Sequence, residues 1–121
     1  MKEVAIGTAR YRLIASERGG QWVAHAERID TGDRFGVECA AATDSAALDR
    51  LEQWLRWQAE HTAALESLQQ AERAYHRTIA GSAFASPTEG PSPVEMQKES
   101  LEQVEAARVR LDEVRAQKPE C

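Results

Sequence analysis

The character of the sequence changes near Thr43, and this change limits what the chain can fold into. Before Thr43, short runs that are typical of strands alternate with turn residues. From Thr43 to Ile79 neither proline nor glycine occurs, so this stretch predicts one helix of about 50 Å at a rise of about 1.5 Å per residue. A small sheet of short strands cannot cover a helix of that length. Part of the helix therefore needs a partner other than the sheet.

Residues 1–42 are predicted to form a three-stranded antiparallel β-meander. Gly19 and Gly20 mark the first turn, because glycine adopts positive φ angles without a steric cost. A second turn is expected at 31–33, where Gly32 lies between two polar residues. The first strand is expected to end with 11–15, and the other two strands are assigned to 21–29 and 34–41.

The two turns also predict which side chains share a face of the sheet. If each turn has three residues, at 18–20 and 31–33, all odd-numbered residues lie on one face, since side chains alternate along a strand. That face is the more apolar one and is expected to form the core. Its members are Tyr11, Leu13, Val23, Ile29, Phe35, Val37 and Cys39. The opposite face carries Arg10, Arg12, Trp22 and Arg28.

The helix predicted over 43–80 has two apolar stripes. One of the polar residues at 43–45 is expected to cap its N-terminus. The first stripe is expected to pack on the sheet and consists of Leu48, Leu51 and Leu55. The second stripe recurs at spacings of three or four residues and needs another partner. Its members are Trp54, Trp57, His61, Leu65, Leu68, Tyr75 and Ile79.

Residues 81–93 are rich in proline and glycine and are predicted to be a loop. Ser92, Pro93 and Glu95 then form a capping box with proline at the first helical position, so a second helix is expected over 94–117. Its apolar side chains form one narrow stripe on a charged helix, which is the pattern of a coiled-coil seam. They are Leu101, Val104, Ala107, Leu111 and Val114.

These elements predict a single α+β domain over residues 1–121. A three-stranded antiparallel β-meander is followed by a long helix, and the second helix folds back on it. The two helices form an antiparallel, coiled-coil-like helical hairpin.

Composition and charge argue against several classes of function. At 121 residues the chain fits one domain, and it has no apolar run long enough to span a bilayer. The net charge of −5 arises after residue 42, because the residues before that point carry equal numbers of acidic and basic side chains. Excess acid disfavours nucleic-acid binding by the helices. The chain shows no secretory signal and its two cysteines are expected to be reduced, so the predicted location is the cytoplasm.

No motif in the sequence carries a recognisable enzymatic chemistry. The histidines lack metal-ligand spacing, and neither a metal nor another cofactor is predicted. The expected register places His25 opposite Cys39, and a Cys–His pair can act as nucleophile and base. Nothing marks an oxyanion hole or an orienting third residue, so a buried histidine beside a small apolar side chain is the simpler interpretation. We predict that the protein is not an enzyme.

The predicted shape favours a protein–protein interaction or oligomerisation module. The apolar stripes of the two helices would be covered by another protein or, in a homodimer, by a second copy of the chain. The interface candidates are Trp54, Trp57, Leu65, Leu68, Tyr75, Leu101, Val104, Leu111 and Val114.

An alternative is nucleic-acid-linked regulation through the mixed face of the sheet. The arginines of that face could bind phosphate, and its tryptophan could stack on a base. The candidate residues are Arg10, Arg12, Trp22 and Arg28. The order of three strands and a helix, with glycines in the first turn and Thr43 before the helix, resembles HicB-type antitoxins in outline. The resemblance implies an antitoxin-like regulator, and the helical hairpin departs from that family.

Overall fold

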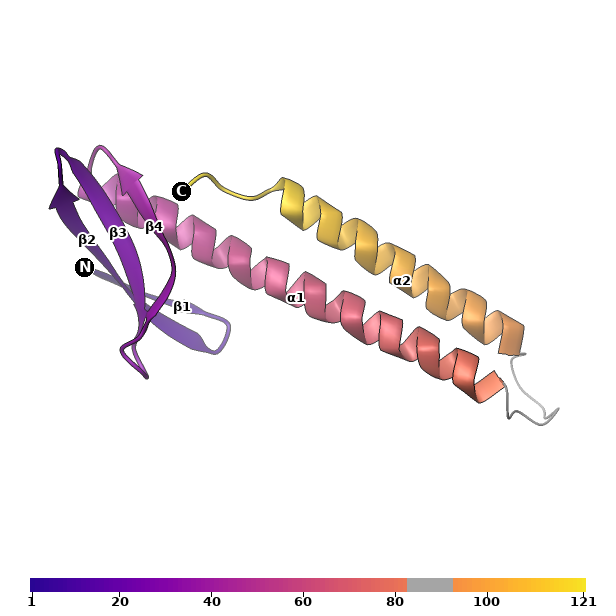
Figure 1. Cartoon of the computed structure of the whole chain (residues 1–121). Coiled ribbons are helices and arrows are strands. Elements are labelled where there is room, and N and C mark those ends of the chain that lie inside the picture. Colours follow the sequence, from indigo (N-terminus) through magenta and orange to yellow (C-terminus); the bar gives the residue numbers. More distant parts are fainter. Residues whose placement is uncertain (83–92) are drawn as a thin grey trace. The chain divides into compact units, whose positions relative to one another are not determined.

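The chain has an α+β fold in which an antiparallel sheet precedes two helices (Figure 1). The computed structural model describes residues 1–82 and 93–121, with side chains described for 1–80 and 94–121. The described residues form one four-stranded sheet with the strand order β1-β2-β3-β4. Its elements are β1 (Lys2–Ile6), β2 (Ala9–Arg18), β3 (Gln21–Arg28), β4 (Arg34–Ala41), α1 (Asp44–Ser82) and α2 (Pro93–Ala116).

The N-terminal strand β1 was not predicted, so the expected count of three strands is wrong and the sheet has four. β1 pairs with β2 from Lys2 opposite Leu13 to Ile6 opposite Ala9. Gly7, at a φ of 61°, and Thr8 make the turn between the two strands. This is a two-residue hairpin loop, for which a residue with positive φ is the usual signal. Gly7 is visible in the sequence, but a single glycine marks a turn less clearly than the pair Gly19 and Gly20 does.

The turn between β2 and β3 has two residues, and this overturns the predicted faces of the sheet. Arg18 pairs directly with Gln21, while Gly19 and Gly20 have φ angles of 59° and 81°. One residue fewer in the turn shifts β3 by one position and exchanges its faces. Leu13 therefore lies beside Ala26, and both are fully buried. The predicted core residues of this strand, Val23 and His25, are instead on the opposite face.

β4 contains a bulge that exposes another predicted core residue. Ala24 pairs with Cys39, and Ala26 pairs with Phe35. β4 therefore has more residues between Phe35 and Cys39 than β3 has between Ala24 and Ala26. Gly36 takes a φ of 81° there, and a Cβ on it would lie 2.6 Å from the Trp54 ring. The bulge thus needs a glycine both for its backbone and for the approach of Trp54. Val37, in the bulge, is 40% exposed.

The first part of α1 covers the inner face of the sheet. Thr43 is the N-cap, since its Oγ1 accepts a hydrogen bond of 3.1 Å from the backbone N–H of Ala46. Leu51 and Leu55 are buried against the sheet and Leu48 is half-buried there, as the first apolar stripe predicts. The buried core consists of Val4, Tyr11, Leu13, Ala24, Ala26, Cys39, Ala41, Ala47, Leu51, Trp54 and Leu55.

The chain divides into two compact units. We call residues 1–60 with 117–121 the sheet unit, and residues 61–116 the hairpin unit. In the hairpin unit α2 lies alongside the second part of α1 and runs in the opposite direction (Figure 1). The predicted loop at 81–93 and the capping box at Ser92 lie outside the residues whose side chains are described. Over the described residues, neither helix has an apolar stretch sufficient to cross a membrane.

Candidate functional site

The Cys–His pair considered from the sequence is not formed. His25 is on the outer face of the sheet, where its Nε2 lies 3.2 Å from Oε1 of Glu27. Cys39 is fully buried on the inner face and is bonded to Cys121. The prediction that these two residues face each other is wrong, because it depended on a three-residue first turn. This arrangement cannot supply a thiolate with an imidazole base.

The four residues predicted to form an anion-binding surface are divided between the two faces of the sheet. Arg10 and Arg12 are on the outer face, each within 4 Å of a carboxylate oxygen of Glu3, at 3.8 and 3.7 Å. Trp22 and Arg28 are on the inner face; Trp22 packs against the core, and Arg28 pairs with a neighbouring aspartate at 3.1 Å. The structure therefore does not bring them together into one basic surface.

The two tryptophans of α1 fill space at the sheet rather than project from it. Trp54 is 9% exposed and packs on the glycine of the bulge, while Trp57 is half-buried against the same core. Their ring centroids are 6.4 Å apart. Lys118 places its Nζ 5.7 Å from the ring centroid of Trp57, which is within the range of a cation–π contact. Trp54 is therefore not available as an anchor for a partner.

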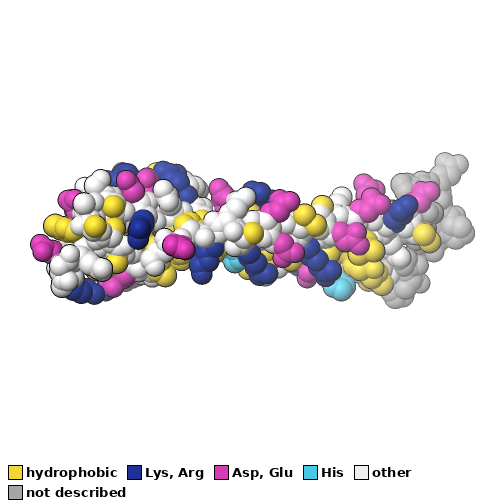
Figure 2. All heavy atoms as spheres, turned by 90° about the horizontal axis from the view of Figure 1, so that it is seen from above, with side chains coloured by type: hydrophobic (Ala, Val, Ile, Leu, Met, Phe, Trp, Pro, Cys, Tyr) yellow, Lys and Arg dark blue, Asp and Glu magenta, His cyan; other side chains and the backbone are white. Residues whose placement is uncertain are grey.

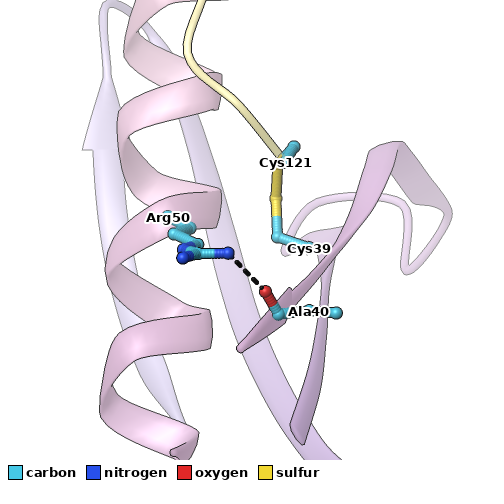
Figure 3. The surroundings of a disulfide bond; sticks show 4 residues. All are labelled: Cys39, Ala40, Arg50 and Cys121. Carbon is cyan, nitrogen blue, oxygen red and sulfur yellow. Dashed lines mark hydrogen bonds between the residues drawn. A yellow bond between two sulfur atoms is a disulfide. The ribbon is translucent and has the colours of Figure 1, made fainter. Parts of the chain in front are cut away.

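A disulfide bond joins Cys39 of β4 to Cys121, with the two Cα atoms 4.5 Å apart (Figure 3). The prediction that both cysteines are reduced is wrong for this structure. The bond holds residues 117–121 against the rest of the sheet unit, where Lys118, Pro119 and Glu120 border a shallow depression beside Trp54. Beside the disulfide, Arg50 of α1 donates a hydrogen bond of 2.9 Å to the carbonyl oxygen of Ala40 (Figure 3). This bond ties the helix to β4.

An ion pair ties β1 to α1 and makes the stability of the sheet unit depend on pH. Nζ of Lys2 lies 3.1 Å from Oε2 of Glu52, and Arg56 contacts the same carboxylate at 3.2 Å. The Lys2 hydrogen bond is the main cause that lowers the pKa of Glu52; partial burial opposes it, and Arg56 adds to it. A carboxyl with a lowered pKa stabilises the fold above its unfolded pKa, and this contribution disappears as the pH falls through its folded pKa.

We expect Glu52→Gln to lower the free energy of unfolding by about 0.5 kcal/mol at neutral pH, the size typical of a partly exposed pair. The difference from wild type should vanish in acid, once the wild-type carboxyl is protonated. Urea-induced unfolding of both proteins at neutral and at acid pH measures this difference in the free energy of unfolding. Asp49→Asn is the matched control, because Asp49 is 3.9 Å from Lys2 and more exposed. An equal effect of Glu52→Gln at both pH values would contradict the conclusion that the ionised Glu52 carboxylate stabilises the sheet unit.

The apolar interface candidates of the helices fall into two groups. Val104, Leu111 and Val114 are buried, with exposed fractions of 3%, 4% and 0%, and so are not available to a partner. Leu65, Leu68 and Tyr75 of α1 are half-buried. Leu101 alone of the α2 candidates is exposed, at 39%. Sequence reasoning missed Val109, which is 56% exposed, because it does not belong to the narrow stripe.

Charged side chains surround the exposed apolar residues of α2. Figure 2 shows acidic and basic side chains interspersed with apolar ones along the helices. Lys98, Glu102, Arg108 and Asp112 are all exposed, and none of them forms an ion pair with another residue in the described part of the chain. These charges are therefore not paired with any described residue of the hairpin unit.

Within the described residues, no group of three or more histidine, cysteine or acidic side chains could hold a metal ion.

No protein-family model matches the chain, and neither a curated protein nor a solved structure does. The fold and its surfaces thus define an α+β protein with a four-stranded antiparallel sheet and a separate unit of two paired helices.

Proposed function

We propose that the protein is a non-enzymatic interaction module that self-associates through its helical hairpin. The observation that carries the proposal is the set of apolar side chains left exposed on α2 after α1 has covered its other side. Leu101 and Val109 are 39% and 56% exposed, although each could be covered by a second helix. Leu101 and Val109 lie about two helical turns apart, so a partner helix that runs along α2 would cover both.

The seam between α1 and α2 has the spacing of a coiled coil. Its buried and half-buried positions alternate between steps of three and four residues, which is the seven-residue repeat of a left-handed supercoil. On α2 they are Gln97, Ser100, Val104, Ala107, Leu111 and Val114. On α1 one row with this spacing is His61, Ala64, Leu68, Ala71, Tyr75 and Thr78, and Leu65, Glu72 and Ala74 beside it are also half-buried. The contact of 3.4 Å between Nε of Arg115 and Nε2 of His61 fixes the antiparallel register at one end.

This seam buries little apolar surface of its own. Several of its positions hold small or polar residues, and the buried residues in the described part of the hairpin unit are Ala64, Val104, Leu111 and Val114. Most of the stability of a helix in water comes from tertiary packing of its apolar face. A second hairpin would add the burial that one hairpin lacks, so self-association stabilises the helices as well as joining two copies.

Size-exclusion chromatography with light scattering tests the proposal. We expect a mass near twice 13.4 kDa that falls toward the monomer on dilution, with an absorbance ratio at 260 and 280 nm typical of protein alone. A monomer at every concentration would contradict self-association. Co-purified nucleic acid that is released at high salt would favour the alternative, nucleic-acid-linked function instead.

A further inference from the structure

We propose that the bond between Cys39 and Cys121 is a redox-sensitive latch on residues 117–121. These residues, which we call the strap, belong to the sheet unit and border the depression beside Trp54. A dithiol reductant opens the latch by attacking the sulfur of Cys121, and the freed strap uncovers the side chain of Trp54. The latch lies within the sheet unit and does not depend on the proposed self-association.

Apart from the disulfide, little holds the strap in place. Within the described part of the chain, no hydrogen bond or ion pair reaches residues 118–121. Nζ of Lys118 lies 5.7 Å from the ring centroid of Trp57, and a cation–π contact is weak at an exposed site. Pro119 is half-buried, and the other residues of the strap are exposed. Once the disulfide is broken, the strap is therefore expected to leave the sheet.

The strap covers an apolar part of the sheet unit. Trp54 is 9% exposed, and it lines the depression together with Lys118, Pro119 and Glu120. Val37, in the bulge of β4, lines the same depression. Departure of the strap removes one wall of the depression, so that the Trp54 ring becomes accessible next to Val37. The state of the disulfide thus decides whether this apolar surface is shielded.

The fold of the sheet does not depend on the strap. Among the described residues, none of the apolar side chains that form the core or pack against it belongs to residues 117–121. Each strand pairs with another strand and not with the strap. Arg50 still joins α1 to β4, and Leu51 and Leu55 remain buried against the sheet. Release of the strap therefore leaves the sheet folded, although with a lower free energy of unfolding.

The two sulfur atoms of the latch differ in access. Cys39 has no exposed surface and lies on the inner face of β4, whereas Cys121 is exposed. Two shallow depressions are lined by Cys121, and neither of them is lined by Cys39. Figure 3 shows the disulfide leading from Cys39 on β4 to Cys121. Thiol–disulfide exchange depends on which sulfur an incoming thiolate can reach, so attack is expected at Sγ of Cys121.

Opening of the latch is a two-electron reduction by a dithiol. One thiolate of the dithiol attacks Sγ of Cys121, the bond to Cys39 breaks, and the sulfur of Cys39 leaves as a thiolate that takes a proton from solvent. The second thiolate of the reductant then displaces Cys121 from the mixed disulfide and closes a disulfide within the reductant. The protein gains two thiols, and the dithiol is oxidised.

Iodide quenching of tryptophan fluorescence tests the release of the strap. The folded protein is first oxidised with diamide and is then measured with and without dithiothreitol, which serves as the dithiol. We expect reduction to raise the quenching constant by about 1.5-fold, because a shielded tryptophan ring becomes accessible to solvent. Far-ultraviolet circular dichroism should stay unchanged, since the sheet and the helices remain folded.

Three variants serve as controls for the quenching measurement. Cys121→Ser should show the higher quenching constant without reductant and should not respond to it. Trp54→Phe should lose most of the response, because Trp54 lines the depression beside the strap. Trp22→Phe removes the same kind of side chain from a position that does not line this depression, and should keep the response.

The rate of reduction tests whether the sulfur of Cys121 is reached in the folded protein. We expect the rate to be proportional to the dithiothreitol concentration and to change by less than about twofold when urea is added below the unfolding transition. A bond that became accessible only after unfolding would be reduced at a rate that rises steeply with urea.

Several results would overturn the latch. They are thiols that stay free after treatment with diamide, a quenching constant that does not respond to reduction, and a reduction rate that rises steeply with urea. Loss of helix and strand content on reduction would overturn it as well, because the sheet unit would then unfold rather than release the strap.

Discussion

Reduction of the bond between Cys39 and Cys121 is expected to lower the free energy of unfolding by about 4 kcal/mol. The two residues are 82 apart in the sequence, and a cross-link across a loop of that length removes about 4–5 kcal/mol of chain entropy from the unfolded state. Cys39 is fully buried in the core of the sheet unit, so the bond is anchored at one end in rigid structure. Urea transitions with and without a phosphine reductant measure the difference.

Two variants separate the loss of the cross-link from damage to the core. Cys121→Ser should match the reduced wild-type protein and should no longer respond to reductant, because Cys121 is exposed. Cys39→Ser should be less stable still, since it also places a hydroxyl at a position with no exposure. Identical transitions of the wild-type protein with and without reductant, together with two titratable thiols, would show that the bond is absent in solution.

The order of the elements could be predicted from local signals in the sequence. The strand at 34–41 and the start of the long helix after Thr43 match the structure, because a glycine-bearing turn and an N-cap act within a few residues. The long stretch without proline or glycine likewise predicts one continuous helix, as α1 is. Such features depend on residues that are close together in the chain.

The faces of the sheet could not be predicted, because they depend on the length of a turn. Whether Arg18 belongs to the first turn or to β2 changes every assignment on β3, and no local signal decides it. The bulge at Gly36 depends on the approach of Trp54 from α1, which a strand pattern does not contain. The disulfide depends in the same way on the position of a distant segment.

The candidate interface was predicted only in part, for a geometric reason. Leu101 and Val104 are one turn apart on α2 and were assigned to one stripe, but only Val104 faces α1. A residue at the margin of a stripe can project to either side, and the width of the partner helix decides which. The sequence therefore predicts that α2 has an apolar side, whereas the structure separates the buried seam of α2 from its exposed side.

A charge introduced on the buried side of α2 should cost far more stability than one on its exposed side. Leu111→Glu should destabilise the hairpin unit by about 4 kcal/mol, because it buries a carboxylate without a partner at a position that is 4% exposed. Leu101→Glu changes the same residue type on the same helix at a position that is 39% exposed, and should cost no more than about 0.5 kcal/mol. Far-ultraviolet circular dichroism during thermal unfolding measures both.

The two variants should also differ in what they do to association. Leu101→Glu should keep its helix content and yet lose the proposed self-association, because the introduced carboxylate replaces an exposed apolar side chain of α2. Leu111→Glu should lose helix content first, and any dimer only as a consequence. Leu101→Ala and Leu111→Ala, which remove size without adding charge, should show the same order of stability. If Leu101→Glu unfolds the helices as readily as Leu111→Glu, then Leu101 belongs to the seam and is not available for self-association.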